Sequence, residues 1–405
     1  MSSLNTNRRD FLRIGAAATA LPFAAKGHAT ERQSAAEVKR YVTLGRTGLE
    51  ISDISFGAST LRLGQERLVH HALDRGINYF DTAEGYARTE SEQVLGKVLK
   101  DMRDQVIITS KAVTEPDSSR ESLMGRLDES LKRLQTDYVD IFMNHAVNDV
   151  AVLSNPEWHA FIDKAKEQGK IRFAGMSGHA GYLLDCLDYA FDQDMADVIL
   201  VAHTFGEDPK FYENLTRWVD WVAKHPKLPE RLARAKELDV GVIAMKTLMG
   251  ARLNDMRPYE TGDATFAQAA FRWVLSNPNV DALIVTMREE ATIDEYLGAS
   301  GYEGLAAGDM ELLERYAKQH GASYCRFACS DCSSACPYGV PIPDLMRTRM
   351  YATDYRDVQF AREEYALLET NGEACLSCSG EPCANACTHG LPLAELCAPT
   401  HEMLA

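Results

Sequence analysis

The sequence predicts an α/β fold: a (β/α)8 TIM barrel followed by a small helical domain rich in cysteine. Eight short apolar runs alternate with longer amphipathic stretches between residues 41 and 308, and nine of the ten cysteines lie in the last 81 residues. Near-continuous apolar runs are typical of strands buried on both faces of a parallel sheet. Eight β/α units over about 260 residues also match the usual size of such a barrel. We therefore expect a barrel at 41–308 and a separate domain at 323–405.

The expected strands are short, apolar and bounded by polar or turn residues. They are Ile51–Gly57, Tyr79–Glu84, Val106–Lys111, Tyr138–His145, Phe173–Gly178, Val198–Thr204, Val240–Leu248 and Ala282–Met287. The expected helices are Gln65–Arg75, Ser91–Asp101, Ser118–Gln135, Glu157–Gly169, Gly181–Asp192, a longer stretch across 209–238, Thr265–Ser276 and Thr292–Ser300. Ser118 predicts a helix start, and Gly76 and Gly169 predict helix ends. A doubly wound sheet is the alternative, but no G-x-G-x-x-G motif follows the first strand.

Composition and charge limit the class of protein. The 405 residues are 45% hydrophobic and 25% charged, which excludes a disordered or collagen-like chain. Lys and Arg number 43 against 59 Asp and Glu, so the formal net charge is -16. Because an acidic surface repels phosphate backbones, a general nucleic-acid binder is excluded.

The N-terminus resembles a twin-arginine export signal. Residues 7–13 read NRRDFLR and precede a short alanine-rich apolar run at 14–25, and small residues at 27–29 suit a signal peptidase. We expect residues 1–29 to be removed after passage through the twin-arginine translocase, leaving a periplasmic and still more acidic protein. A surface-lying amphipathic helix or a single anchor is the alternative, but the run is too short to span a bilayer.

Four ionisable residues follow three neighbouring expected strands. Asp81 and Tyr86 lie at and after the end of the second strand, Lys111 ends the third, and His145 ends the fourth. In a TIM barrel the C-terminal ends of the strands carry the catalytic groups, because their loops converge at one mouth. We expect these four side chains to meet there.

These residue types suit proton transfer at a carbonyl or an alcohol. The phenol of Tyr86 is a weak acid, with an ordinary pKa of about 10, and the ammonium group of Lys111 would lower that pKa by stabilising the phenolate. Asp81 would hold Lys111, and His145 would hydrogen-bond the carbonyl oxygen. Each residue alone could be a capped loop or surface residue, but the combination favours a catalytic site.

The same segments resemble the aldo-keto reductase family. Residues 80–86 (FDTAEGY), 109–111 (TSK), 144–145 (NH), 175–177 (GMS) and 242–246 (VIAMK) match its motifs in order. The resemblance covers about residues 42–300. It implies a small-molecule carbonyl or alcohol substrate and the cofactor NADP(H). It also implies that Tyr86 is the general acid/base, Lys111 its pKa modulator, Asp81 the partner of that lysine, and His145 the residue that orients the substrate.

The nicotinamide side of the resemblance is altered. The family usually holds the nicotinamide amide with Ser, Asn and Gln and stacks a Tyr on the ring. Ser177 matches the serine, whereas Gly178, Leu200 and His203 stand where the other three are expected. Only His203 offers a planar ring for stacking, so we expect Ser177 and His203 to contact the cofactor.

The phosphate side is altered as well. The family's Pro-Gly stretch in the last barrel loop reads Thr286-Met287-Arg288-Glu289 here. Lys246, Gly250 and Arg288 are the residues we expect at the dinucleotide phosphates. An exported enzyme has no nicotinamide pool around it, so bound NADP(H) would have to be exported with the protein and recycled in place.

The segment from Glu207 to about Leu228 is longer than a simple connection. Its apolar residues recur at helical spacing at positions 211, 215, 218 and 222. This spacing predicts an extra helix packed on the core, or alternatively an aromatic lid over the barrel mouth. Trp221 lies off the apolar stripe and is a candidate contact for a substrate or partner.

The C-terminal cysteines form two groups with similar spacing. They read Cys325-x3-Cys329-x2-Cys332-x3-Cys336-Pro and Cys375-x2-Cys378-x4-Cys383-x3-Cys387. The segments at 336–342 and 387–393 also align with each other at an offset of 51 residues. Closely spaced thiolates are typical ligands of iron-sulfur cubes, and in two-cluster ferredoxins the fourth cysteine of each group binds the other cluster. We therefore predict two 4Fe-4S clusters in a helical ferredoxin-like arrangement.

The spacing departs from the standard motif, so alternatives stay open. One cluster with an altered second site, a zinc site, or disulfides would also use these cysteines. Some aldo-keto reductases carry such a tail, and this resemblance favours the clusters. Cys186 is expected to be a buried apolar residue, and Cys397 has no predicted role.

The sequence as a whole predicts an exported oxidoreductase that takes electrons from NADP(H), from the clusters, or from both. Clusters imply one-electron exchange with a periplasmic or membrane partner. A barrel that no longer catalyses and acts as a binding or electron-transfer subunit is the second hypothesis, and a purely structural cysteine tail is the third.

Overall fold

The computed structural model of the chain describes one compact unit within Ala35–Ala405. The described residues are 36–179, 182–205, 227–248, 256–260, 265–320, 325, 329, 331–353 and 357–405. The predicted signal peptide at 1–29, almost all of the segment from Glu207 to Leu228, and Gly250 lie outside them. No described helix is long and apolar enough to cross a membrane.

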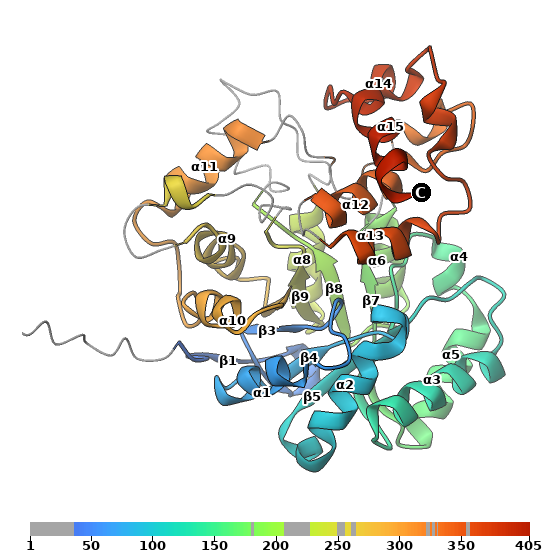
Figure 1. Ribbon diagram of the computed structural model, residues 1–405. Coiled ribbons are helices and arrows are strands. Elements are labelled where there is room, and N and C mark those ends of the chain that lie inside the picture. The colour runs from blue at the N-terminus through green and yellow to red at the C-terminus, as the bar shows by residue number, and fades with distance from the viewer. Residues whose placement is uncertain are drawn as a thin grey trace, which may run out of the picture. The chain divides into compact units, whose positions relative to one another are not determined.

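Eight parallel strands form a closed barrel, as predicted (Figure 1). They are β3 (Ile54–Gly57), β4 (Tyr79–Asp81), β5 (Ile107–Ala112), β6 (Val139–Asn144), β7 (Ile171–Gly178), β8 (Val198–Ala202), β9 (Gly241–Met245) and β10 (Ala282–Thr286). Each strand pairs with the next along the chain, and β10 closes the ring on β3. This order excludes the doubly wound alternative.

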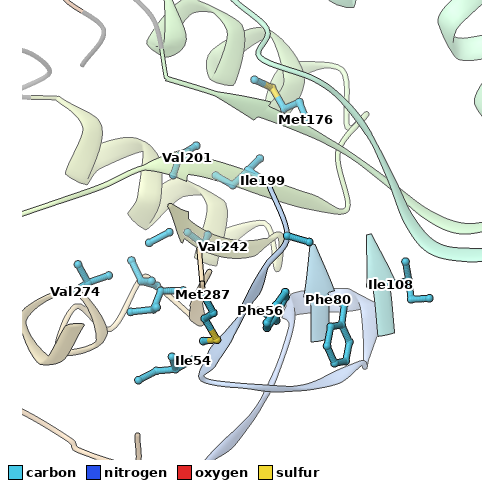
Figure 2. Packing of buried hydrophobic residues seen from close by; sticks show 14 of the residues in the cluster. Ile54, Phe56, Phe80, Ile108, Met176, Ile199, Val201, Val242, Val274 and Met287 are labelled. Carbon is cyan, nitrogen blue, oxygen red and sulfur yellow. The ribbon is translucent and has the colours of Figure 1, made fainter. Parts of the chain in front are cut away.

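Helices cover the outer face of the barrel. They are α1 (Glu66–Asp74), α2 (Glu90–Leu99), α3 (Arg120–Leu134), α4 (Val150–Leu153), α5 (Pro156–Glu167), α6 (Leu183–Asp192), α8 (Leu228–Glu237), α9 (Phe266–Leu275) and α10 (Glu290–Leu297). Outward side chains of the strands, including Phe56, Phe80 and Ile108, pack in the layer beneath these helices (Figure 2). The side chains of a strand alternate between its two faces, so the residues between them point into the barrel.

A short antiparallel hairpin precedes the barrel and corrects the first predicted strand. The run expected as Ile51–Gly57 is split into β2 (Glu50–Ser52), which pairs with β1 (Tyr41–Thr43), and β3. Asp53 separates them because its carboxylate accepts hydrogen bonds from Ser300 Oγ (2.7 Å) and Gly301 N (2.8 Å). Hairpin side chains pack against inward residues of the barrel strands, which closes the barrel at the start of those strands.

Helix ends follow local chemistry, with one shift. Gly76 and Gly169 adopt left-handed φ values of +87° and +69° after α1 and α5, the conformation that glycine takes most easily. The N-cap of α3 is Ser119 and not Ser118, since the Ser119 side chain accepts a hydrogen bond from Ser122 N. The Ser118 side chain instead accepts a hydrogen bond from Glu115 N (2.9 Å).

The chain after the barrel is helical. Its elements are α11 (Asp309–His320), η7 (Ser333–Ala335), α12 (Ile342–Thr353), α13 (Val358–Tyr365), η8 (Glu373–Leu376), α14 (Pro382–Ala386) and α15 (Leu393–Leu404). A fully buried ion pair from Arg272 to Asp309 (2.6 Å) joins α9 to α11. Beyond α11, Ile342, Leu345 and Leu393 belong to a second apolar core. We call residues 325–405 the C-terminal module.

Candidate active site

The four predicted catalytic residues lie at the C-terminal ends of three adjacent strands. Asp81 is the last residue of β4, and Tyr86 begins η2 (Tyr86–Thr89) in the loop that follows. Lys111 lies near the end of β5, and His145 directly follows β6. All four line one cavity. The parallel register explains this convergence, because Asp81 pairs with Thr109 and Lys111 is two residues farther along the same face.

Lys111 and Asp81 form a buried ion pair. The Lys111 Nζ atom donates to Asp81 Oδ1 at 2.7 Å and to the Thr82 carbonyl at 2.6 Å. Their side chains are 0% and 1% exposed. Burial raises the pKa of Asp81, and the charge of Lys111 opposes that rise. The lysine is thereby held in one position beneath the cavity.

Tyr86 and His145 face each other across the cavity. The Tyr86 hydroxyl lies 3.5 Å from His145 Nε2, and the two rings meet edge to face with centroids 5.4 Å apart. Lys111 Nζ is 4.9 Å from the centroid of the Tyr86 ring. Burial, together with the charges of Lys111, Lys246 and Arg347, lowers the pKa of His145 to about 3. His145 is therefore a neutral imidazole near neutral pH.

The electrostatics of Tyr86 differ from the sequence expectation. Burial raises the pKa of Tyr86 well above its usual range, and the negative charge of Asp81 adds to this effect. The lowering expected from Lys111 is not found, because burial of the phenol is the largest influence on its pKa. Tyr86 is accordingly a protonated phenol in this cavity.

The turn after Tyr86 has an unusual backbone. Ala87, Arg88 and Thr89 all have positive φ values, of 48°, 56° and 74°. L-residues adopt this region at a cost, and several in succession are rare. Ser91 Oγ, directly after the turn, forms hydrogen bonds with Thr82 Oγ1 (2.7 Å) and the Ala58 carbonyl (2.8 Å). These bonds hold the turn, and hence Tyr86, against the ends of β3 and β4.

The cavity has a volume of about 1110 Å³, large enough for a substrate and an extended cofactor. Of the predicted cofactor contacts, Ser177, Lys246 and Arg288 line it. His203 is not among the lining residues, and Gly250 lies outside the described part of the chain.

The predicted stacking role of His203 is wrong, and strand alternation explains why. Leu200 on β8 points into the barrel, so residues an odd number of positions away point outward. The His203 ring packs against Trp273 of α9, with centroids 5.4 Å apart, and its Nε2 lies 3.4 Å from Asn277 Nδ2. It therefore belongs to the layer between the barrel and its helices.

Ser177 and Lys246 come from the ends of β7 and β9. The Ser177 hydroxyl accepts a hydrogen bond from Ala146 N (2.9 Å), which ties it to the loop that carries His145. Lys246 has a φ value of 58°. Next to it, Thr247 is 1% exposed and lines the cavity, and its hydroxyl has no hydrogen-bond partner. A buried hydroxyl without a partner is costly, and a bound polar ligand would satisfy it.

Arg288 is held by the C-terminal module. Its guanidinium lies 3.4 Å from the carboxylate of Asp357, the N-cap residue of α13. The preceding Met287, which replaces a family glycine, is buried in the barrel's outer core (Figure 2). The predicted phosphate contact at Arg288 thus already has an anionic partner.

Part of the cavity wall carries no signal in the sequence. Arg347 and Tyr351 of α12 and Glu364 of α13 line the cavity together with the barrel residues. His179, after β7, also lines it, and burial lowers the pKa of His179 well below its ordinary value. No motif marks Arg347, because the periodicity of a helix shows which face is apolar and not where the helix docks.

Six cysteines of the two predicted groups lie in or against the core of the C-terminal module: Cys325, Cys332, Cys336, Cys375, Cys383 and Cys387. Burial, with the neighbouring thiols of Cys329, Cys387 and Cys383, raises the pKa of Cys332 to about 12. Within the described ranges, however, no group of three or more His, Cys, Asp or Glu is placed so that it could hold a metal ion. The predicted clusters thus have no support from a formed metal site. Cys186, buried on α6, is apolar core, as expected.

Comparison with known proteins identifies the class. A closed parallel barrel with Tyr, His and a Lys–Asp pair at its C-terminal mouth defines a TIM-barrel enzyme. The model of the Aldo/keto reductase family matches residues 53–259, more than half of the chain. The chain belongs to this family, and it is an oxidoreductase of the type that acts on carbonyl and alcohol groups.

Relatives match the barrel over nearly their whole length. The chain is 31% identical to the aldo-keto reductase YhdN of Bacillus subtilis (65% of this chain, 89% of the relative). It is 29% identical to L-galactose dehydrogenase of Arabidopsis thaliana (63% and 86%). The fold is similar to that of aldo-keto reductase AKR11C1 from Bacillus halodurans, with a TM-score of 0.55 and 20% identity (68% and 95%). About one third of this chain has no counterpart in these proteins.

The cavity electrostatics predict an unusual titration of Lys246. Burial, aided by the positive charge of Arg347, lowers the pKa of Lys246 to about 7. Lys246 should therefore be an ammonium ion below about pH 7 and a neutral amine above it. Reductive ¹³C-methylation followed by NMR titration would show this, with the signal assigned by Lys246→Arg. Arg347→Met should raise the pKa of Lys246, and a wild-type midpoint near 10 would contradict the cavity electrostatics.

Proposed function

We propose that this chain is an exported oxidoreductase that interconverts a carbonyl and an alcohol at the barrel mouth, with Tyr86 transferring the proton at oxygen. The observation that carries the proposal is the cavity geometry, in which the Tyr86 hydroxyl lies 3.5 Å from His145 Nε2, above the Lys111–Asp81 pair. These groups come from three strand ends, and an oxygen bound in the cavity can reach both Tyr86 and His145.

In the reductive direction, the protonated Tyr86 donates its proton to the carbonyl oxygen as that oxygen gains charge. Neutral His145 can donate a hydrogen bond from Nε2 to the same oxygen and fix its orientation. Lys111 stabilises the phenolate that remains, and Asp81 keeps the lysine in place. In the oxidative direction the same phenolate takes the proton back.

NADP(H) is the cofactor that family membership implies. The cavity volume and the unpartnered hydroxyl of Thr247 fit an extended polar ligand beside Lys246. Bound NADP(H) would give or accept the hydride at carbon. Ser177 and Lys246 are the residues that would hold it, whereas Arg288 would first have to exchange its partner Asp357.

A second function is favoured by the altered cofactor contacts. If the barrel binds a ligand but no longer catalyses, the chain would act as a binding or electron-transfer subunit. The displaced His203 ring and the Arg288–Asp357 pair favour this alternative. The buried Lys111–Asp81 pair argues against it. Removing two charged groups from water costs free energy, and this pair has no evident role in packing.

Replacement of Tyr86 separates the two functions. Tyr86→Phe should lower kcat for aldehyde reduction by about 10² to 10⁴, because general acid catalysis is lost while the ring is kept. The measurement is NADPH- or dithionite-driven reduction of an aldehyde panel by anaerobically purified protein. Tyr182→Phe is the matched control, since Tyr182 is 59% exposed and outside the cavity lining. Activity unchanged in Tyr86→Phe would favour the non-catalytic barrel.

We further propose that the C-terminal module holds two 4Fe-4S clusters that exchange electrons with a periplasmic or membrane partner. The neighbours of the described cysteines support clusters shared by the two motifs: Cys332 lies near Cys329, Cys383 and Cys387, and Cys375 lies near Cys336, Cys378 and Cys383. Each set contains a cysteine of the other motif, as in two-cluster ferredoxins. The Leu391 amide also points to Cys387 Sγ at 3.5 Å, a bond that suits a thiolate ligand.

Metal analysis tests the clusters directly. Protein purified without oxygen should contain about eight iron and eight sulfide per chain and absorb near 400 nm, with bleaching by dithionite. Cys375→Ser should lose about half of the iron, whereas Cys186→Ser, which changes the thiol in the barrel's core, should retain it all. A colourless protein loaded with zinc would refute the clusters and support a structural tail.

We propose that the protein is exported, because an arginine pair stands at positions 8 and 9, near the N-terminus. The twin-arginine route carries folded proteins, which suits a chain that acquires cofactors before transport. Replacement of both arginines by lysine should leave the protein in the cytoplasm, as cell fractionation would show. Lys26→Arg, which keeps the charge elsewhere in the segment, should be exported normally. Periplasmic protein in the double variant would exclude this route.

A further inference from the structure

The C-terminal module forms one wall of the active-site cavity. Its helices α12 and α13 contribute Arg347, Tyr351 and Glu364 to the lining. Glu363 of α13 reaches two barrel residues, with its carboxylate 3.4 Å from Arg62 and 3.5 Å from Arg88. Because Arg88 lies two residues after Tyr86, the module is anchored at the catalytic turn.

Arg347 extends from α12 into the cavity. Its side chain is 26% exposed, and Nη1 donates to Asp344 Oδ1 at 2.8 Å. Tyr351, one turn farther along α12, also shares a hydrogen bond with it. A guanidinium carries five N–H donors, more than these two partners use. Asp344 is 44% exposed, so solvent screens the charge that it contributes.

Of the described residues of the C-terminal module, Arg347 and Glu364 are the charged ones that line this wall of the cavity. Burial raises the pKa of Glu364, which favours its uncharged form. The two histidines nearby, His145 and His179, add no charge because burial and the charges of Lys246 and Arg347 lower the pKa of each. An anionic group in the cavity would therefore find a cationic partner on this wall in Arg347.

We propose that Arg347 binds a carboxylate of the substrate, so that the enzyme acts on oxo- or hydroxy-carboxylic acids. The inference rests on the proposed function, since it names the substrate class of the same site. A planar guanidinium matches a carboxylate with two parallel hydrogen bonds. Arg347 lines the same cavity as His145 and Tyr86, so an acid held by Arg347 keeps its carbonyl in the space that these two residues share.

A matched pair of ligands tests the proposal. Calorimetric titration of 4-carboxybenzaldehyde and of its neutral methyl ester into the full-length protein compares the same aldehyde with and without the charge. Arg347→Met should weaken binding of the acid by about ten-fold or more, with the ester changed less than about two-fold. Arg347→Lys should bind the acid with intermediate affinity, because lysine keeps the positive charge but cannot form the two parallel hydrogen bonds of a guanidinium. Arg349→Met, on the same helix but outside the cavity lining, should match wild type.

Four outcomes would overturn the proposal. The first three are equal weakening of acid binding and ester binding in Arg347→Met, unchanged binding of both ligands in that variant, and no binding of the acid by the wild-type protein. The fourth comes from titration of 2′,5′-ADP as a further ligand. If Arg347→Met mainly weakens binding of 2′,5′-ADP, Arg347 contacts a cofactor phosphate. Turnover of both aldehydes is measured alongside. Arg347-dependent binding of the acid without any turnover would uphold the carboxylate site and reject the proposed oxidoreduction. Turnover of both aldehydes with equal kcat/KM would uphold the proposed oxidoreduction and reject the carboxylate site.

Discussion

The buried ion pair between Lys111 and Asp81 is the constraint on which the rest of the site depends. Two charged groups with 0% and 1% exposure are costly to remove from water, and only close mutual contact offsets that cost. The register of β4 against β5 supplies that contact, because it places both side chains on the inner face of the barrel. Tyr86 then lies over the lysine, and the His145 ring meets the Tyr86 ring edge to face. The protonated phenol and the neutral imidazole both follow from this closed, poorly hydrated floor.

The barrel and the catalytic residues could be predicted because their signals are local. Eight apolar runs define eight strands, and a polar residue at a strand end marks the mouth. His203 was misplaced although the information was present, since counting in steps of two from Leu200 assigns it to the outer face. The split at Asp53 could not be predicted, because it depends on hydrogen bonds to residues 300 and 301, which are distant in the chain.

Arg347 illustrates what sequence patterns do not contain. It lies more than 200 residues after His145 in the chain. The sequence pattern of α12 predicts an apolar face that packs on the module's own core, and it does not indicate a contact with the cavity. Its entry into the cavity depends on contacts between the module and the barrel, such as the Glu363 and Asp357 ion pairs. The side chains of these ion pairs are 11–25% exposed, so the pairs are partly buried, and they fix where the helices of the module meet the site. The predicted direction of the Tyr86 pKa shift is wrong for a similar reason, because burial of the phenol depends on the packing of distant elements.

The cavity wall that α12 and α13 contribute is made later during synthesis than the barrel. The barrel strands end at Thr286, whereas Arg347 and Glu364 are made later. A ribosome-bound chain can therefore close its barrel while the mouth is still open on one side. Helices α12 and α13 then complete the enclosure, so the floor of the cavity is made before the wall that covers it.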